Sequence, residues 1–129
     1  MKHFRKEEFL CRCGKCEIPA EVEANIVALV ENVLDPLRER YGKPIVVNSG
    51  YRCAKHNREV GGVTQSQHLV GEAADIKPTT NCTNFTNELA RLKQIIIESK
   101  QFDQLIVYPT FLHVSWKRQG KNRRTVLWH

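Results

Sequence analysis

Residues 66–76 read Ser-Gln-His-Leu-Val-Gly-Glu-Ala-Ala-Asp-Ile and place two potential metal ligands, His68 and Asp75, in one short stretch. A third candidate, His113, follows in residues 112–116, which read Leu-His-Val-Ser-Trp. Imidazole nitrogens and carboxylate oxygens bind Zn²⁺ at roughly 2.0–2.2 Å. Three protein ligands leave a fourth coordination position open, which distinguishes a catalytic zinc site from a closed structural one. The three residues therefore indicate a zinc-dependent hydrolase.

Local features around these residues favour a shared site. Small residues between His68 and Asp75 let the chain turn back towards a metal. They are Gly71, Ala73 and Ala74. Strand-like alternation along residues 113–116 turns His113 to one face and Val114 to the other. We therefore expect His113 to face a cleft while Val114 packs in the core.

Hydrophobic periodicity predicts a single α+β domain over residues 1–129, with helices packed on an antiparallel sheet. The expected helices cover residues 20–41, 53–60 and 84–100, and the expected strands cover residues 44–50, 73–77, 103–108, 112–117 and 125–128. Pro36 should kink the first helix, and Gly42 should cap it. Residues 119–122 are predicted to join the last two strands as a hairpin turn.

The 129-residue chain has a net charge of +6, which favours polyanionic partners without selecting one. Basic residues surround the expected hairpin turn: Lys117, Arg118, Lys121, Arg123 and Arg124. They form either a patch for an anionic polymer or a solvated hairpin tip, and we favour the tip. The polar first residues do not resemble a secretory signal, and no segment approaches the ~20 apolar residues of a membrane span. Synthesis in the cytoplasm is the resulting expectation.

Five cysteines, three of them in Cys11-Arg-Cys13-Gly-Lys-Cys16, argue against a full disulfide framework. The three clustered thiols can form part of a structural zinc knuckle whose fourth ligand is Cys53, Cys82 or a histidine. The spacing lacks the two-pair arrangement of zinc ribbons. We therefore expect reduced thiols in a turn rather than a second zinc site at Cys11, Cys13 and Cys16.

The motif Ser66-x-His68-x-x-Gly71-x-Ala73-x-Asp75, followed by His113-Val-Ser, resembles the peptidase M15 family. Three further stretches carry the resemblance, which extends from about Phe4 to Leu127. They are the Phe-x-x-x-Glu-Phe opening at residues 4–9, Val-Asn-Ser-Gly-Tyr-Arg at residues 47–52 and Phe-Asp-Gln-Leu-Ile at residues 102–106. The family contains zinc D-alanyl-D-alanine carboxypeptidases, dipeptidases and phage peptidoglycan endopeptidases.

The resemblance implies a hedgehog/D-Ala-D-Ala-peptidase-like fold with one catalytic Zn²⁺ on His68, Asp75 and His113. Arg52 would hold the substrate and stabilise the anionic tetrahedral species, as a fixed guanidinium can. Four further residues are predicted to bind substrate or support a ligand: Tyr51, Ser66, Gln104 and Ser115. The substrate would be a peptidoglycan stem peptide or crosslink. The protein would act as a monomer and would not bind nucleic acid. It would act at the cell wall after phage-type release.

The general base is where this sequence departs from the family. Members often carry a carboxylate three residues before the last histidine ligand, where this chain has Thr110. Others carry a glutamate where this chain has Tyr108. Asp103 is the best remaining carboxylate, and it would either deprotonate the zinc-bound water or orient His113. Glu72 is the runner-up.

Two alternatives remain open, the first of them because of these missing carboxylates. The first is a non-catalytic, zinc-containing module of the same fold that binds wall peptide without cleaving it. The second is a nucleic-acid-binding protein that uses the cysteine cluster and the basic residues near the C-terminus.

Overall fold

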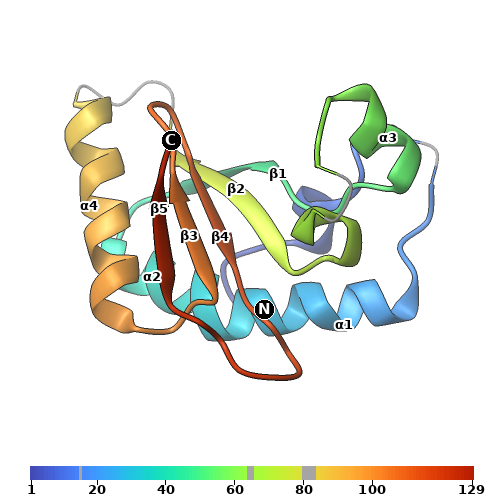
Figure 1. Ribbon diagram of the computed structural model, residues 1–129. Helices are drawn as coiled ribbons and strands as arrows, with labels where there is room; N and C mark the ends of the chain where they lie inside the picture. Colours follow the sequence, from blue (N-terminus) through green and yellow to red (C-terminus); the bar gives the residue numbers. More distant parts are fainter. Residues whose placement is uncertain (15, 64–65, 80–83) are drawn as a thin grey trace.

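A mixed five-stranded sheet with helices packed against it forms the framework of the computed structural model (Figure 1), which describes residues 1–14, 16–63, 66–79 and 84–129. The strands are β1 (Ile45–Ser49), β2 (Ala73–Pro78), β3 (Gln104–Val107), β4 (Leu112–Ser115) and β5 (Thr125–Trp128). The helices are α1 (Ala20–Leu29), α2 (Asp35–Tyr41), α3 (Ala54–Glu59) and α4 (Phe85–Ser99). The predicted α+β class is confirmed. Residues 80–83, between the expected strand at residues 73–77 and the expected helix at residues 84–100, lie outside the described residues.

The long amphipathic segment at residues 20–41 is helical throughout, but its hydrogen-bonding pattern changes from α to π before Pro36. A π-helical turn at Val30–Leu34 separates α1 from α2, and Pro36 occupies the first turn of α2. Proline has no backbone N–H and disturbs the preceding turn, so a wider turn at this place is physically reasonable. Gly42 ends α2 in the left-handed conformation, with φ +78°. The predicted interruption and cap are both confirmed.

The sheet has the order β1-β2-β4-β3-β5 and is antiparallel except for the β3–β5 pair, which is parallel. The predicted hairpin between the last two strands is therefore wrong. Both edges of β4 are already paired, with β2 on one side and β3 on the other. The chain after β4 consequently crosses to the free edge of β3. There the Thr125 N–H donates to the Asp103 carbonyl at 3.0 Å.

One hydrophobic core lies between the helices and the sheet. Its fully buried members come from both layers and include Leu29, Leu34, Ile76, Leu92, Leu105 and Val114. The 3-10 turn Gln67–Val70 and α3 lie at the end of the sheet away from α4 (Figure 1). No helix in the described parts of the chain is long and apolar enough to cross a bilayer.

Candidate metal centre

Asp75 and His113 face each other across two neighbouring strands. They are direct partners in the antiparallel register of β2 and β4. His68 reaches the same point from the 3-10 turn that precedes β2. This turn ends at Gly71, whose φ is +77° and where a Cβ atom would lie 2.8 Å from the Val22 carbonyl oxygen. A glycine is therefore required for the chain to bring His68 back over Asp75.

The three side chains have the separations expected of ligands to one metal ion. Asp75 Oδ1 lies 3.2 Å from His68 Nε2 and 3.2 Å from His113 Nδ1. One ligand atom from each residue lies within 4.8 Å of the other two. Tetrahedral bonds of about 2.0–2.1 Å correspond to ligand–ligand distances of about 3.3 Å. The geometry and the nitrogen–oxygen donor set therefore both fit Zn²⁺.

Hydrogen bonds at the far side of each imidazole fix which nitrogen faces Asp75. His68 Nδ1 lies 2.7 Å from the Gly50 carbonyl oxygen, and His113 Nε2 lies 3.1 Å from Gln67 Oε1. Both oxygens can only accept, so these two nitrogens carry the protons. The lone pairs of His68 Nε2 and His113 Nδ1 are thereby directed towards the shared centre. Orientation by an outer acceptor is typical of histidines that bind metal.

The Asp75 carboxylate is charged at neutral pH. Burial by itself raises the pKa of this carboxyl, but the neighbouring imidazoles of His113 and His68 outweigh burial and lower the pKa to about 2. A negative oxygen between two imidazoles is a donor set that suits a divalent cation such as Zn²⁺.

Asp103 lies behind the metal centre rather than in it. Its carboxylate is fully buried, with bonds from Arg123 at 2.9 Å and from Gln67 Nε2 at 2.9 Å. Burial raises the pKa of the carboxyl, and the hydrogen bonds and charge of Arg123, helped by Gln67, lower it below the ordinary value. A carboxylate only accepts, so the bond to Gln67 Nε2 also turns Gln67 Oε1 towards His113. Asp103 is connected to His113 through Gln67.

Arg52 reaches the centre from the loop after β1. Its Nη2 donates to Ser66 Oγ at 3.3 Å, and Ser66 Oγ also accepts the His68 backbone N–H at 3.1 Å. The Nε of Arg52 is buried, and no acceptor among the described residues bonds to it. Buried donors are normally satisfied, so this atom is suited to binding an oxygen of a ligand.

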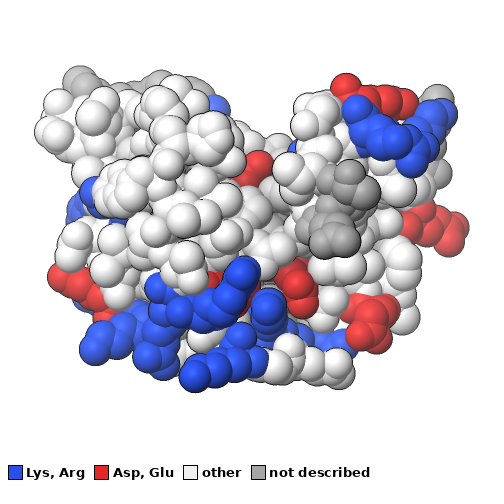
Figure 2. Space-filling model, in the orientation of Figure 1, with Lys and Arg blue, Asp and Glu red and all other residues white. Residues whose placement is uncertain are grey.

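The candidate metal centre opens into a cleft of about 410 Å³. The space-filling surface is hollowed between the strands and α3 (Figure 2). One wall contains exposed Val60 and Val63, and the other contains Tyr108 and Phe111, whose rings stack at 4.4 Å. Among the described residues that line the cleft, Asp75 is the one carboxylate. The cleft therefore combines apolar walls with the polar side chains of the candidate metal centre.

The other predicted site residues divide between the cleft and the core. Gln104 and Ser66 line the cleft, while Tyr51 packs in the hydrophobic core. Ser115 is fully buried, and its hydroxyl accepts the Gln104 N–H at 3.1 Å. Thus Ser115 connects β3 and β4 instead of facing the cleft. Glu72 is absent from the cleft lining; burial raises the pKa of its carboxyl.

The sequence reasoning missed three contributors to this centre: Gly50, Gln67 and Arg123. Gln67 is adjacent to a predicted ligand, but no sequence pattern shows that its amide turns towards His113. The prediction of a solvated hairpin tip is wrong for Arg123, which pairs with buried Asp103. Figure 2 shows basic side chains along the same edge of the molecule as the β4–β5 loop. Arg118, which lies in the β4–β5 loop, is bound to Glu21 and Asn25.

Comparisons with known proteins agree with this geometry. A family model described as peptidase M15 matches residues 2–115. The zinc D-Ala-D-Ala carboxypeptidase of Streptomyces albus G is 46% identical to this chain over 44 residues. Those residues are 33% of this chain and 17% of that relative. The similarity to that relative therefore concerns a small part of its length.

Proposed function

The chain belongs to the peptidase M15 family, and we propose that it is a zinc-dependent peptidase that hydrolyses peptide bonds of bacterial peptidoglycan. The observation that carries the proposal is the His68–Asp75–His113 set, with both imidazoles oriented and both Asp75 distances at 3.2 Å. The resemblance to a zinc D-Ala-D-Ala carboxypeptidase supports a stem peptide as the substrate. Carboxypeptidase action at a terminal D-Ala and endopeptidase action at a crosslink are both included.

In this proposal His68, Asp75 and His113 would hold one Zn²⁺ at the cleft that they line. When bound, the ion lowers the pKa of a coordinated water towards ~7 and polarises a carbonyl oxygen. Arg52 directs its buried Nε and its Nη2 group to the negative oxygen that develops during attack. Ser66 holds Arg52 and the His68 backbone in one arrangement. The apolar walls, Val60 and Val63 opposite Tyr108 and Phe111, position a peptide with small side chains.

We assign Asp103 to orienting His113 rather than to deprotonating water. The carboxylate is fully buried, is engaged by Arg123 and Gln67, and is absent from the lining of the cleft. A general base must be within hydrogen-bond reach of the proton it removes. Asp103 instead fixes the Gln67 amide, which fixes the proton of His113 on Nε2.

Because peptidoglycan lies outside the cytoplasmic membrane, the proposed activity places the protein at the cell wall, with phage-type release as its route. The test is zinc content together with cleavage. Purified protein is incubated with stem peptides ending in D-Ala-D-Ala and with crosslinked dimers, with and without chelator, and the products are weighed by mass spectrometry. Zinc-dependent loss of D-Ala identifies a carboxypeptidase, and separation of dimers identifies an endopeptidase. Protein without zinc at this centre would contradict the proposal.

A non-catalytic wall-peptide binding module is the second candidate. The observation that favours it is the lack of any carboxylate other than Asp75 among the described cleft residues. Such a module would bind stem peptides in a zinc-dependent manner and return them intact. Calorimetric binding without any cleavage product would therefore replace the first candidate with this one.

A further inference from the structure

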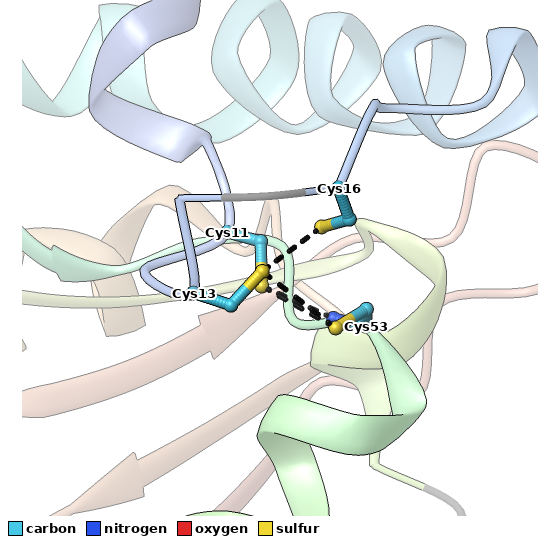
Figure 3. Close-up of side chains that lie close together, drawn as sticks. All are labelled: Cys11, Cys13, Cys16 and Cys53. Carbon is cyan, nitrogen blue, oxygen red and sulfur yellow. Dashed lines mark hydrogen bonds between the residues drawn. The ribbon is translucent and has the colours of Figure 1, made fainter.

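Four cysteines from two distant segments meet near the 3-10 turn at Lys6–Phe9. Cys11, Cys13 and Cys16 come from the loop before α1, and Cys53 comes from the loop between β1 and α3 (Figure 3). The Sγ atoms of Cys11 and Cys53 lie 3.7 Å apart, those of Cys13 and Cys53 3.9 Å, and those of Cys13 and Cys16 3.4 Å. All four Sγ atoms lie within 4.8 Å of one another. Cys82 lies outside the described residues.

These distances fit shared coordination of a metal and do not fit disulfides. A disulfide has an S–S length of about 2.05 Å, which each of these distances exceeds by more than 1 Å. A tetrahedral Zn²⁺ with bonds of about 2.3 Å to sulfur has sulfur–sulfur edges of about 3.8 Å. The three measured sulfur–sulfur distances lie close to this edge length, one slightly above it and two below it.

We propose that Cys11, Cys13, Cys16 and Cys53 bind one structural Zn²⁺ through their four Sγ atoms. Four protein ligands close the coordination sphere, as structural sites require. Thiolates select zinc over the hard cations Mg²⁺ and Ca²⁺. The sequence Cys13-Gly-Lys-Cys16 supplies a Cys-x-x-Cys pair, the spacing that zinc-binding turns use.

Backbone donors support charged sulfurs at this position. The Cys53 N–H donates to Cys11 Sγ at 3.4 Å, and the His56 N–H donates to Cys53 Sγ at 3.4 Å. Hydrogen bonds to charged acceptors are stronger than those between neutral groups, so these two contacts favour thiolates over thiols. Lys55 and His56 line the adjoining surface cavity together with Glu59. Lys55 places a cationic side chain near a four-thiolate centre, whose net charge with Zn²⁺ is negative.

A reactive redox site is a poorer interpretation of the same four residues. Reactive cysteines have a lowered pKa, because the thiolate is the nucleophile. Burial raises the pKa of Cys11, and burial followed by the neighbouring thiols raises the pKa of Cys16. Burial therefore works against an activated thiolate at Cys11 and Cys16.

The cluster holds the loop that supports the His68–Asp75–His113 centre. The Tyr51 N–H donates to the Phe9 carbonyl at 2.9 Å, and a Cβ atom on Gly50 would lie 2.7 Å from Phe9 Cα. The Gly50 carbonyl accepts the proton of His68 Nδ1. Zinc at the cluster would thus clamp residues 9–16 onto residues 50–53, next to Arg52. That the clamp positions Arg52 for the reaction rests on the proposed function, whereas zinc binding by the four cysteines does not.

The test counts zinc and identifies its ligands. Wild-type protein should contain two zinc ions per chain, and His113→Ala should retain one. Cobalt loaded into His113→Ala should show thiolate-to-cobalt charge-transfer absorption, which Cys16→Ser added to this variant should weaken because one of four thiolates is lost. Cys82→Ser is the matched control, because it makes the same change at the remaining cysteine and should keep the absorption.

X-ray absorption at the zinc edge of the wild-type protein provides a measurement that requires no variant. It should show sulfur at about 2.3 Å together with nitrogen or oxygen at about 2.0 Å. One zinc per chain with nitrogen and oxygen ligands alone would overturn the cluster and leave the proposed function intact. One zinc with sulfur ligands alone would support the cluster and contradict the proposed function. Freshly purified protein whose four cysteines form disulfides would also overturn the cluster.

Discussion

The His68–Asp75–His113 centre and the Cys11–Cys13–Cys16–Cys53 cluster differ in how the fold holds their ligands. In the first, two ligands are cross-strand partners in the sheet, and each imidazole is fixed by an outer acceptor. In the second, all four ligands lie on loops, and the sulfurs have the support of two backbone N–H groups. The first set has three ligands and faces a cleft, and the second has four.

This difference separates two uses of the same metal. A site that performs chemistry needs an open position and ligands whose geometry exists before the metal arrives, which a sheet provides. A site that stabilises loops needs protein ligands at every coordination position of the metal, and the metal itself can organise those ligands. The two centres meet at residues 50–53, where the Gly50 carbonyl serves His68 and Cys53 serves the cluster.

The largest expected effect separates the two centres directly. His113→Ala removes one of three ligands from the proposed catalytic zinc, so hydrolysis should fall by more than about 100-fold, the upper range for losing a mere outer-shell partner. The cysteine cluster should keep its metal in this variant. Steady-state hydrolysis and zinc content measure both results, with His3→Ala as the control histidine. Retained hydrolysis in His113→Ala would mean that the reaction does not use this centre.

Arg52 tests whether the loop between the centres contributes to the reaction. Arg52→Ala removes the guanidinium from the cleft, and loss of one donor to a developing oxyanion costs about 10²-fold or more in kcat. Zinc content should not change, because Arg52 is no ligand in either centre. Arg58→Ala, on exposed α3, is the matched control. An unchanged kcat with a raised KM would assign Arg52 to substrate binding alone.

Gln67 tests the orientation of His113. Gln67→Ala removes the acceptor of the His113 Nε2 proton, and such outer-shell losses lower metal affinity about 10- to 100-fold. Competition with a chromogenic chelator measures the affinity, and Gln94→Ala on the exposed face of α4 controls for the substitution. If the zinc affinity of Gln67→Ala equals that of wild type, the Asp103–Gln67–His113 connection has no role in metal binding.

The smallest expected effect concerns the pH dependence of the Asp103–Arg123 pair. The pKa of Asp103 is lowered in the folded protein, so its ion pair stabilises the fold above the ordinary carboxyl pKa of ~3.9 and loses this effect as pH falls through the folded pKa. Asp103→Asn should cost about 1–3 kcal/mol of unfolding free energy at neutral pH. Arg123 is half exposed, so solvent screens the ion pair and the cost should lie at the lower end of this range.

Denaturant unfolding of metal-free wild type and Asp103→Asn measures this gap, because acid would also release zinc from histidine ligands. The gap should be full at neutral pH and should narrow below about pH 4. A gap that stays constant into acid would show that the charge of Asp103 is not what stabilises the structure.

Local order and residue chemistry were predictable from the sequence. The segment at residues 20–41, the strand at residues 73–77 and the turn before it were expected from periodicity and small residues, and all are present. Periodicity reports which face of an element is buried, so it predicts elements reliably. The expected α+β class and the M15 resemblance were confirmed as well. The zinc-ligand assignment remains a prediction that the geometry supports.

Partners distant in the chain were decided by tertiary structure alone. β5 pairs with β3 in parallel because β4 has no free edge, which no turn signal at residues 119–122 could reveal. Arg123 meets Asp103, and Cys53 meets Cys11 across 42 positions, by the same kind of long-range packing. A sequence shows what each residue can bind and which face of its element it occupies. Which residues become neighbours depends on strand order and loop path, since these are set by the packing of the whole core.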